Sequence, residues 1–266
     1  HASPFFPASM NQLGLADWVV ERHVAWDIGA DKLTRFLADA LDAAAVLADF
    51  SRLIIDPNRR LDDPTAFAAV SDGIAIPGNQ NLDEEQRAQR VQSFFQPYHD
   101  AIAERLARFA ARGEVPALIS VHTCTPVFDR VVRPWHVGIM WDRDPRIAVP
   151  MMEHLRSVPD ICIGDNEPYS GRHPHDFTVD HHAESAGLPH VGIEVRQDLV
   201  RDESGARQWA TILAGALAGP MRGAYAEMGV TMVIESFVVV VVGGMGSLLG
   251  AVVAGIMIGQ VVGITT

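Results

Sequence analysis

The sequence predicts an α/β fold in which helices cover both faces of a mostly parallel or mixed β-sheet. Short apolar segments alternate with amphipathic helical ones over the first 218 residues. A length of 266 residues, 48% of them hydrophobic, is enough to bury a sizeable core in one large domain or two smaller ones. The predicted strands are β-branched, are bounded by Pro, Gly or Asp, and cover residues 53–55, 117–121, 161–163 and 191–195.

Three helical segments accompany these strands. Apolar residues recur on one face of a helix over about 31–49. A second helix opens at Asp83, where two glutamates follow, and Pro97 should kink or split it. The third covers 204–218. Strands that alternate with helices in this way place ligands at the carboxyl ends of the strands.

Charge and cysteine content exclude several classes of protein. The chain has 21 Lys and Arg against 33 Asp and Glu, a net charge of −12, and no basic stripe that could bind nucleic acid. Two cysteines are too few for a disulfide scaffold or a multi-cysteine zinc site. No signal peptide is visible after His1, so we expect a cytoplasmic, N-terminally truncated domain whose true start lies upstream.

The C-terminal part differs in composition from the rest. No charged residue occurs in the 31 positions from 236 to 266. An apolar run of this length can cross a bilayer as a helix, so we predict a membrane-type helical segment with membrane contact through residues 236–264. A buried strand followed by a core helix is the alternative. We therefore divide the chain into residues 1–218 and 219–266.

Two polar residues lie within or directly after predicted core strands. His122 directly follows the strand 117–121, where it is well placed to bind a metal ion, although a hydrogen-bonded loop histidine would look the same. Glu194 lies inside the apolar strand 191–195, and a buried carboxylate costs free energy unless a metal, a cation or catalysis requires it. A salt bridge from Glu194 to Arg196 or to another arginine is the structural alternative.

Three further groups of residues are candidates for substrate binding, metal binding or catalysis. Asn58 and Arg59 follow the segment 53–55 and could clamp a carboxylate, or could form a surface turn. Asp27 precedes a helix, where it could be a ligand or an N-cap. Cys124 has no recognisable partner base, which disfavours a cysteine nucleophile.

Six segments in order resemble the motifs of the N-formylglutamate amidohydrolase family, over about residues 1–218. That family is similar to the zinc carboxypeptidases and the aspartoacylase group, so the resemblance implies a three-layer α/β/α architecture with a central mixed sheet. It also implies hydrolysis of an N-formyl or N-acyl amino acid, such as N-formylglutamate, with zinc or another divalent metal. The segments are 1–3, 25–30, 56–59, 120–123, 164–171 and 192–199.

The resemblance assigns roles to several of these residues. Asn58 and Arg59 match the pair that holds the substrate carboxylate. His122 matches a zinc ligand that follows a central strand, and Glu194 matches the glutamate that activates water. His1 would be the first metal histidine.

The third metal ligand departs from the pattern of the carboxypeptidases, and three further site residues are assigned from their place in the sequence. The carboxypeptidases place a glutamate ligand where this chain has Pro4, so we take Asp27 as the third metal ligand. Tyr169 and Arg172 lie on a loop that should close over the other end of the substrate. His181 could face the site from the start of a helix, or could lie on a solvated helix face.

The segment from about 220 to 266 resembles the permease subunit of branched-chain amino-acid ABC transporters, on residues 227–229, 237–248 and 250–251. This resemblance implies a gene fusion, frameshift or assembly join near Gly219 and Pro220. It also supplies the alternative function, a membrane-embedded permease fragment with a non-catalytic soluble part.

Overall fold

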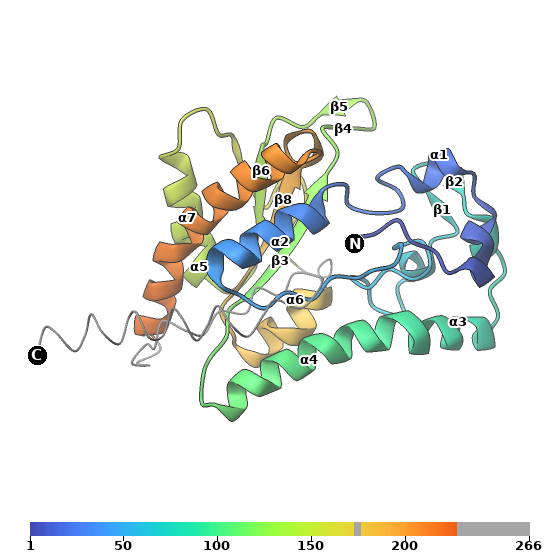
Figure 1. Ribbon diagram of the computed structural model, residues 1–266, viewed down its shortest axis with the longest axis horizontal. Coiled ribbons are helices and arrows are strands. Elements are labelled where there is room, and N and C mark those ends of the chain that lie inside the picture. The colour runs from blue at the N-terminus through green and yellow to red at the C-terminus, as the bar shows by residue number, and fades with distance from the viewer. Residues whose placement is uncertain (173–176, 228–266) are drawn as a thin grey trace, which may run out of the picture.

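The computed structural model describes residues 1–172 and 177–227 (Figure 1). Its central sheet has four strands in the order β3-β8-β6-β7. The pairs β3–β8 and β6–β7 are parallel and the pair β8–β6 is antiparallel, so the predicted mixed sheet is confirmed. The strands are β3 (Leu118–Cys124), β8 (His190–Arg196), β6 (Val137–Met140) and β7 (Ile163–Asp165).

Two apolar clusters lie on opposite faces of this sheet. One joins Ile119 and Ile193 to the helices α2 (Ala30–Leu41), α5 (Pro145–Arg156) and α7 (Glu203–Glu227). The other joins Leu118 to the helices α4 (Gln96–Ala111) and α6 (Phe177–His182). Successive residues of a strand point to opposite faces, so adjacent positions 118 and 119 enter different clusters.

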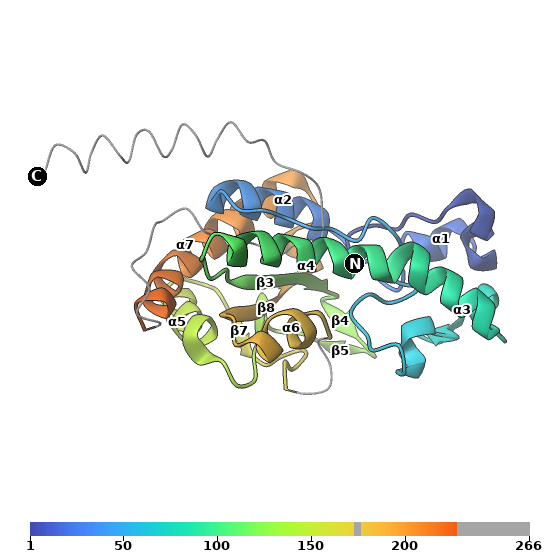
Figure 2. The same cartoon turned by 90° about the horizontal axis from the view of Figure 1, so that it is seen from below.

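A long helical segment links the sheet to the rest of the molecule (Figure 2). It consists of α3 (Glu84–Arg90), a π-helical turn (Val91–Phe95) and α4. The predicted start is confirmed, because Asp83 and Gln86 form a capping box. Pro97 does not split the helical segment, because it lies in the first turn of α4. Its missing N–H removes one α-helical hydrogen bond, and the turn that precedes α4 is π-helical.

The small elements lie outside the central sheet. One hairpin joins β4 and β5, and another joins β1 and β2 at the end of the molecule where α1 and α3 lie (Figure 1). Their bounds are β4 (Val127–Phe128), β5 (Val131–Val132), β1 (Val70–Ser71), β2 (Ile74–Ala75) and α1 (Asp17–Val20).

Two local predictions were wrong. Residues 53–55 are buried but form turns instead of a strand, because their carbonyls bond to side chains: Asn79 donates to Leu53 and Arg90 to Ile54. The helix predicted over 31–49 ends at Leu41, where Asp42 adopts a left-handed conformation with φ 49°.

The predicted boundary near residue 219 falls inside α7, which runs on to Glu227. Within the described residues, no helix combines the length and apolarity needed to cross a membrane. The membrane-type prediction for residues 236–264 lies outside the described part of the chain, and so does the permease-like prediction for about 220–266 from residue 228 onward.

Candidate active site

The site begins at two neighbouring strands. In the parallel register of β3 and β8, His122 pairs with Glu194, so both side chains lie on the same face of the sheet. His122 lies within β3, because the strand continues to Cys124, two residues beyond the predicted loop position. Arg196, one of the arginines considered as a salt-bridge partner of Glu194, donates to Asp198 at 2.8 Å. The sheet therefore holds an imidazole and a carboxylate next to each other.

Two glycines bring a loop close to this face. Gly138 pairs with Glu194 across the antiparallel strands and with Gly164 across the parallel ones. A Cβ atom would lie 2.1 Å from the Glu167 carbonyl oxygen at position 138 and 2.3 Å from it at position 164. The loop can therefore pack on the sheet only because both residues lack a side chain, and this packing brings Tyr169 to the site.

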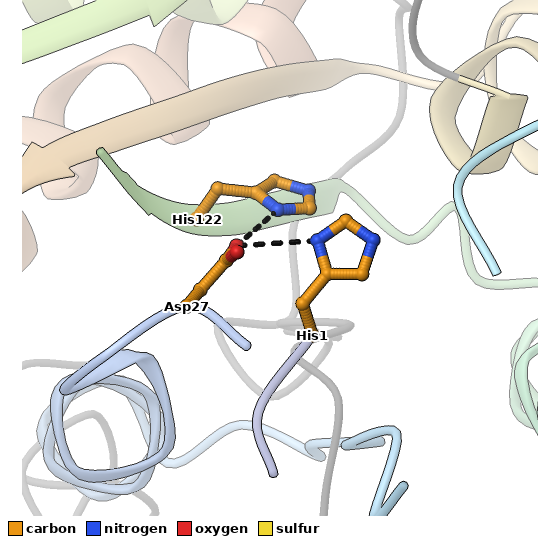
Figure 3. Close-up of side chains that lie close together, drawn as sticks. All are labelled: His1, Asp27 and His122. Atoms are coloured by element: carbon orange, nitrogen blue, oxygen red, sulfur yellow. Dashed lines mark hydrogen bonds and ion pairs between the residues drawn. The ribbon is translucent and has the colours of Figure 1, made fainter. Parts of the chain in front are cut away.

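His1, Asp27 and His122 converge beside the sheet (Figure 3). The Oδ2 atom of Asp27 lies 2.8 Å from Nδ1 of His122 and 3.3 Å from Nδ1 of His1. The start of the chain is held in place by the backbone N–H of Asp27, which donates to the carbonyl of His1 at 2.8 Å. Asp27 is not an N-cap, because Gly29 occupies that position of α2. All three residues are buried, and their ligand atoms lie within 4.8 Å of one another.

The far nitrogen of each imidazole also has a partner. Nε2 of His1 lies 2.7 Å from Oδ1 of Asp56, and Nε2 of His122 lies 3.1 Å from Oγ of Ser120. These contacts hold both rings with Nδ1 toward Asp27. The same arrangement of outer partners orients histidine ligands in metal sites.

The pKa values of two buried carboxyl groups, Asp27 and Asp56, are lowered by their neighbours. Burial by itself raises the pKa of Asp27, but the His1 and His122 imidazoles outweigh it and hold that pKa well below its usual range. Burial likewise opposes ionisation of Asp56, but Arg52 and His1 hold its pKa well below the usual value. Burial and Arg52 lower the pKa of His1, but Asp56 and Asp27 raise it further, so the net shift is upward.

Arg52 and Asp56 were not among the predicted site residues. Arg52 donates to Oδ2 of Asp56 from two nitrogens, at 2.7 and 3.1 Å, and its guanidinium lies 3.5 Å from Oδ1 of Asp27. Asp56 belongs to the segment 56–59 that carries the family resemblance, and this segment was the available signal. Nothing in the local sequence of Arg52 indicates its contact with Asp27, which is 25 residues away.

These residues line a cavity of about 460 Å³. Asn58 is buried and its Oδ1 accepts from the backbone N–H of Thr178 at 2.9 Å, so the surface-turn alternative for this residue is wrong. The cavity brings together most of the predicted site residues: His1, Asp27, Asn58, Arg59, His122, Tyr169 and Glu194.

Arg172 and His181 are exposed and do not line the cavity. The His181 ring stacks on Phe177, with centroids 5.0 Å apart, on the outside of α6. The segment 164–171 instead contributes Tyr169 to the cavity, and the Tyr169 hydroxyl accepts from Nη2 of Arg133 at 2.9 Å. Arg133 is a buried cation that the sequence analysis missed, and no local pattern marks it.

A second pair of histidines lies next to the loop that carries Asn58 and Arg59. Nδ1 of His99 is 2.9 Å from Nε2 of His182, and Nε2 of His99 is 3.0 Å from the carbonyl oxygen of Pro57. Both side chains are buried. Burial lowers the pKa of His99 to about 4 and that of His182 to about 3.

Acidification from pH 6.5 to about 4.5 is expected to destabilise the folded chain by about 2–4 kcal/mol through this pair. In that window the unfolded histidines bind protons but the folded ones do not, because both folded pKa values are lowered. Their contribution is fully present above about pH 6.5 and is lost as the pH falls. Urea unfolding at a series of pH values measures it. His182→Gln should remove roughly half of the slope, and an unchanged slope would contradict the assignment.

Iodoacetamide at pH 8 is expected to label Cys162 and to leave Cys124 unmodified in the folded protein. Cys162 is exposed, whereas burial and the nearby Glu194 carboxylate raise the pKa of Cys124 to about 12. The thiolate is the reactive form, and at this pKa almost none is present. Mass spectrometry of peptides gives the two labelling rates, and rapid labelling of Cys124 would restore the cysteine nucleophile as an alternative.

The fold and the site define an α/β protein with a mixed sheet, a buried His/Asp/His group and an adjacent carboxylate in one cavity. The sequence model of the N-formylglutamate amidohydrolase family matches residues 1–201. The chain belongs to this family, and it is therefore an amidohydrolase.

Two solved structures share the fold. The crystal structure of the gene product Atu2144 from Agrobacterium tumefaciens is 33% identical, with a TM-score of 0.81, over 84% of this chain and 88% of its own. An N-formylglutamate amidohydrolase from Ralstonia eutropha JMP134 is 19% identical, with a TM-score of 0.56, over 86% and 92%. No curated protein matches the chain.

Proposed function

We propose that this chain hydrolyses the amide bond of an N-formyl amino acid such as N-formylglutamate, releasing formate and the free amino acid. The family membership supports the reaction class. The observation that carries the proposal is the cavity itself, in which a buried His/Asp/His group, the Glu194 carboxylate and the Arg59 guanidinium meet.

The donor set of His1, Asp27 and His122 fits a catalytic zinc ion. Such sites use three protein ligands, nitrogen or carboxylate oxygen, about 2.0–2.2 Å from the ion. Ligands at this distance in a tetrahedron are about 3.3 Å apart, close to the 2.8 and 3.3 Å measured here. When bound, zinc polarises the amide carbonyl and makes water a stronger nucleophile.

Glu194 is the proposed general base. Its register position beside His122 places the carboxylate on the face that carries the metal group. As water attacks the formyl carbon, the carboxylate accepts a proton from it. Glu194 then gives this proton to the amide nitrogen, because the amine must be protonated to leave as the C–N bond breaks.

Arg59 is the proposed partner of the substrate carboxylate, with Asn58 beside it. Arg52 also lines the cavity, and its guanidinium contacts Asp56 and Asp27. Tyr169 also lines the cavity and belongs to the loop packed on Gly138. Arg172 and His181 are not part of this proposed site.

Arg59→Lys is expected to raise KM for the N-formyl amino acid by tens-fold. Lysine keeps the positive charge but loses the planar fork that binds a carboxylate through two hydrogen bonds. Steady-state kinetics measures the change, and Arg60→Lys, a substitution of an exposed arginine paired with Asp62, is the matched control. An unchanged KM in Arg59→Lys would remove Arg59 from the substrate site.

One experiment tests the proposal as a whole. Metal content is measured on the purified protein, and formate release is assayed on N-formyl derivatives of glutamate, aspartate, glutamine and leucine. We expect bound zinc, and faster formate release from the acidic substrates. Formate release that is equal for all four would show that the site does not recognise a side-chain carboxylate, and no release from any would overturn the proposed reaction.

A further inference from the structure

The proposed carboxylate site lies on the loop of residues 54–59. Two side chains of the helical segment formed by α3, the π-helical turn and α4 contact the backbone of this loop. The Arg90 guanidinium donates to the carbonyl of Ile54 at 2.8 Å, and His99 contacts the carbonyl of Pro57 at 3.0 Å. These two carbonyls lie on either side of Asp56, and the carbonyl of Pro57 directly precedes Asn58. The helical segment therefore holds the loop at two points.

The π-helical turn between α3 and α4 makes this double contact possible. Arg90 and His99 are nine residues apart, which in a plain α-helix would put them about 180° apart around the axis. A π-turn adds one residue without advancing the helix, so the effective spacing is eight residues and the angle is about 80°. Both side chains can then reach the same loop.

The direction of the hydrogen bonds at His99 is determined by chemistry. The Pro57 carbonyl can only accept, so Nε2 of His99 carries the proton and donates to it. In a neutral imidazole Nδ1 is then an acceptor, and the donor must be Nε2 of His182. The low pKa values of both rings keep them neutral at physiological pH.

His182 connects this chain of hydrogen bonds to the other side of the loop. It lies at the end of α6, and the backbone N–H of Thr178, in the same helix, donates to Oδ1 of Asn58 at 2.9 Å. The helix α6 thus holds the loop through the Asn58 side chain and, by way of His182 and His99, through the Pro57 carbonyl.

We propose that His99 and His182 are positioning residues whose donor–acceptor pair orients Asn58 and Arg59 for the substrate carboxylate. Neither side chain lines the cavity, so each acts through the loop. The inference rests on the proposed function, because it assigns the loop to substrate binding.

The test compares two amides at position 182. The Gln side-chain nitrogen reaches the place of Nε2 and can still donate to His99, whereas the Asn nitrogen matches Nδ1 and cannot. We expect His182→Asn to raise KM for N-formylglutamate by about tenfold, with kcat changed less than about threefold and metal content unchanged. His182→Gln should stay within about threefold of the parent in both constants.

Phe109→Leu is the control for a general loss of stability. Phe109 is buried in the same helix α4, ten residues beyond His99, and this substitution should not change KM. A rise in KM that is equal in His182→Asn, His182→Gln and Phe109→Leu would overturn the proposal, and so would an unchanged KM in His182→Asn.

A second measurement separates this inference from the proposed reaction. If the parent protein releases no formate, hydrogen exchange of the amides in residues 55–60 still reports the positioning of the loop. His182→Asn should exchange faster there than the parent, His182→Gln and Phe109→Leu. Equal exchange in all four proteins would overturn the positioning role whatever the reaction.

Discussion

Glu194→Gln is expected to lower kcat by at least about a hundredfold while bound metal and KM stay close to those of the parent. Glutamine keeps the shape and the hydrogen-bonding capacity of the side chain at the centre of β8, but it cannot accept a proton from water. The register partner His122 is unchanged, so the metal group should remain intact.

Metal analysis and steady-state kinetics on the same preparation check this result. Glu153→Gln, an exposed glutamate on α5 across the sheet from the cavity, is the matched control. A Glu194→Gln protein with near-normal kcat would show that proton transfer does not pass through Glu194, whereas lost metal would give this residue a structural role at the site.

His122→Ala is expected to remove the bound metal and to lower kcat/KM by about a thousandfold or more. His122 supplies one of three ligand atoms, and its imidazole is also one of the two groups that keep the pKa of Asp27 low. Without it, a two-residue site remains in which the carboxylate is easier to protonate, and both changes weaken metal binding.

Elemental analysis after gel filtration measures the metal, and added zinc tests whether activity can be rescued. His154→Ala, an exposed histidine on α5, controls for the loss of an imidazole elsewhere. Full metal occupancy in His122→Ala would contradict the ligand set of His1, Asp27 and His122.

Two adjacent strands of the sheet could be predicted from the sequence because they are continuous apolar segments buried on both sides, whereas β6 was not predicted. Those segments became β3 and β8. Glu194 was found because a polar residue within such a strand is conspicuous, and His122 because it directly follows one. The start of the helix at Asp83 was predictable for a similar reason, since its capping box is local.

The sequence by itself determined the mixed α/β class, the polar residues on its strands and the motifs of the family. Only the tertiary structure decided which distant residues meet: Asp27 contacts His122 over 95 positions, and His1 contacts Asp56 over 55. It also placed His181 outside the cavity and made residues 53–55 a turn held by Arg90. The physical reason is that hydrophobic periodicity reports the burial of local segments, whereas ion pairs and side-chain-to-carbonyl bonds depend on packing between segments, which no local pattern records.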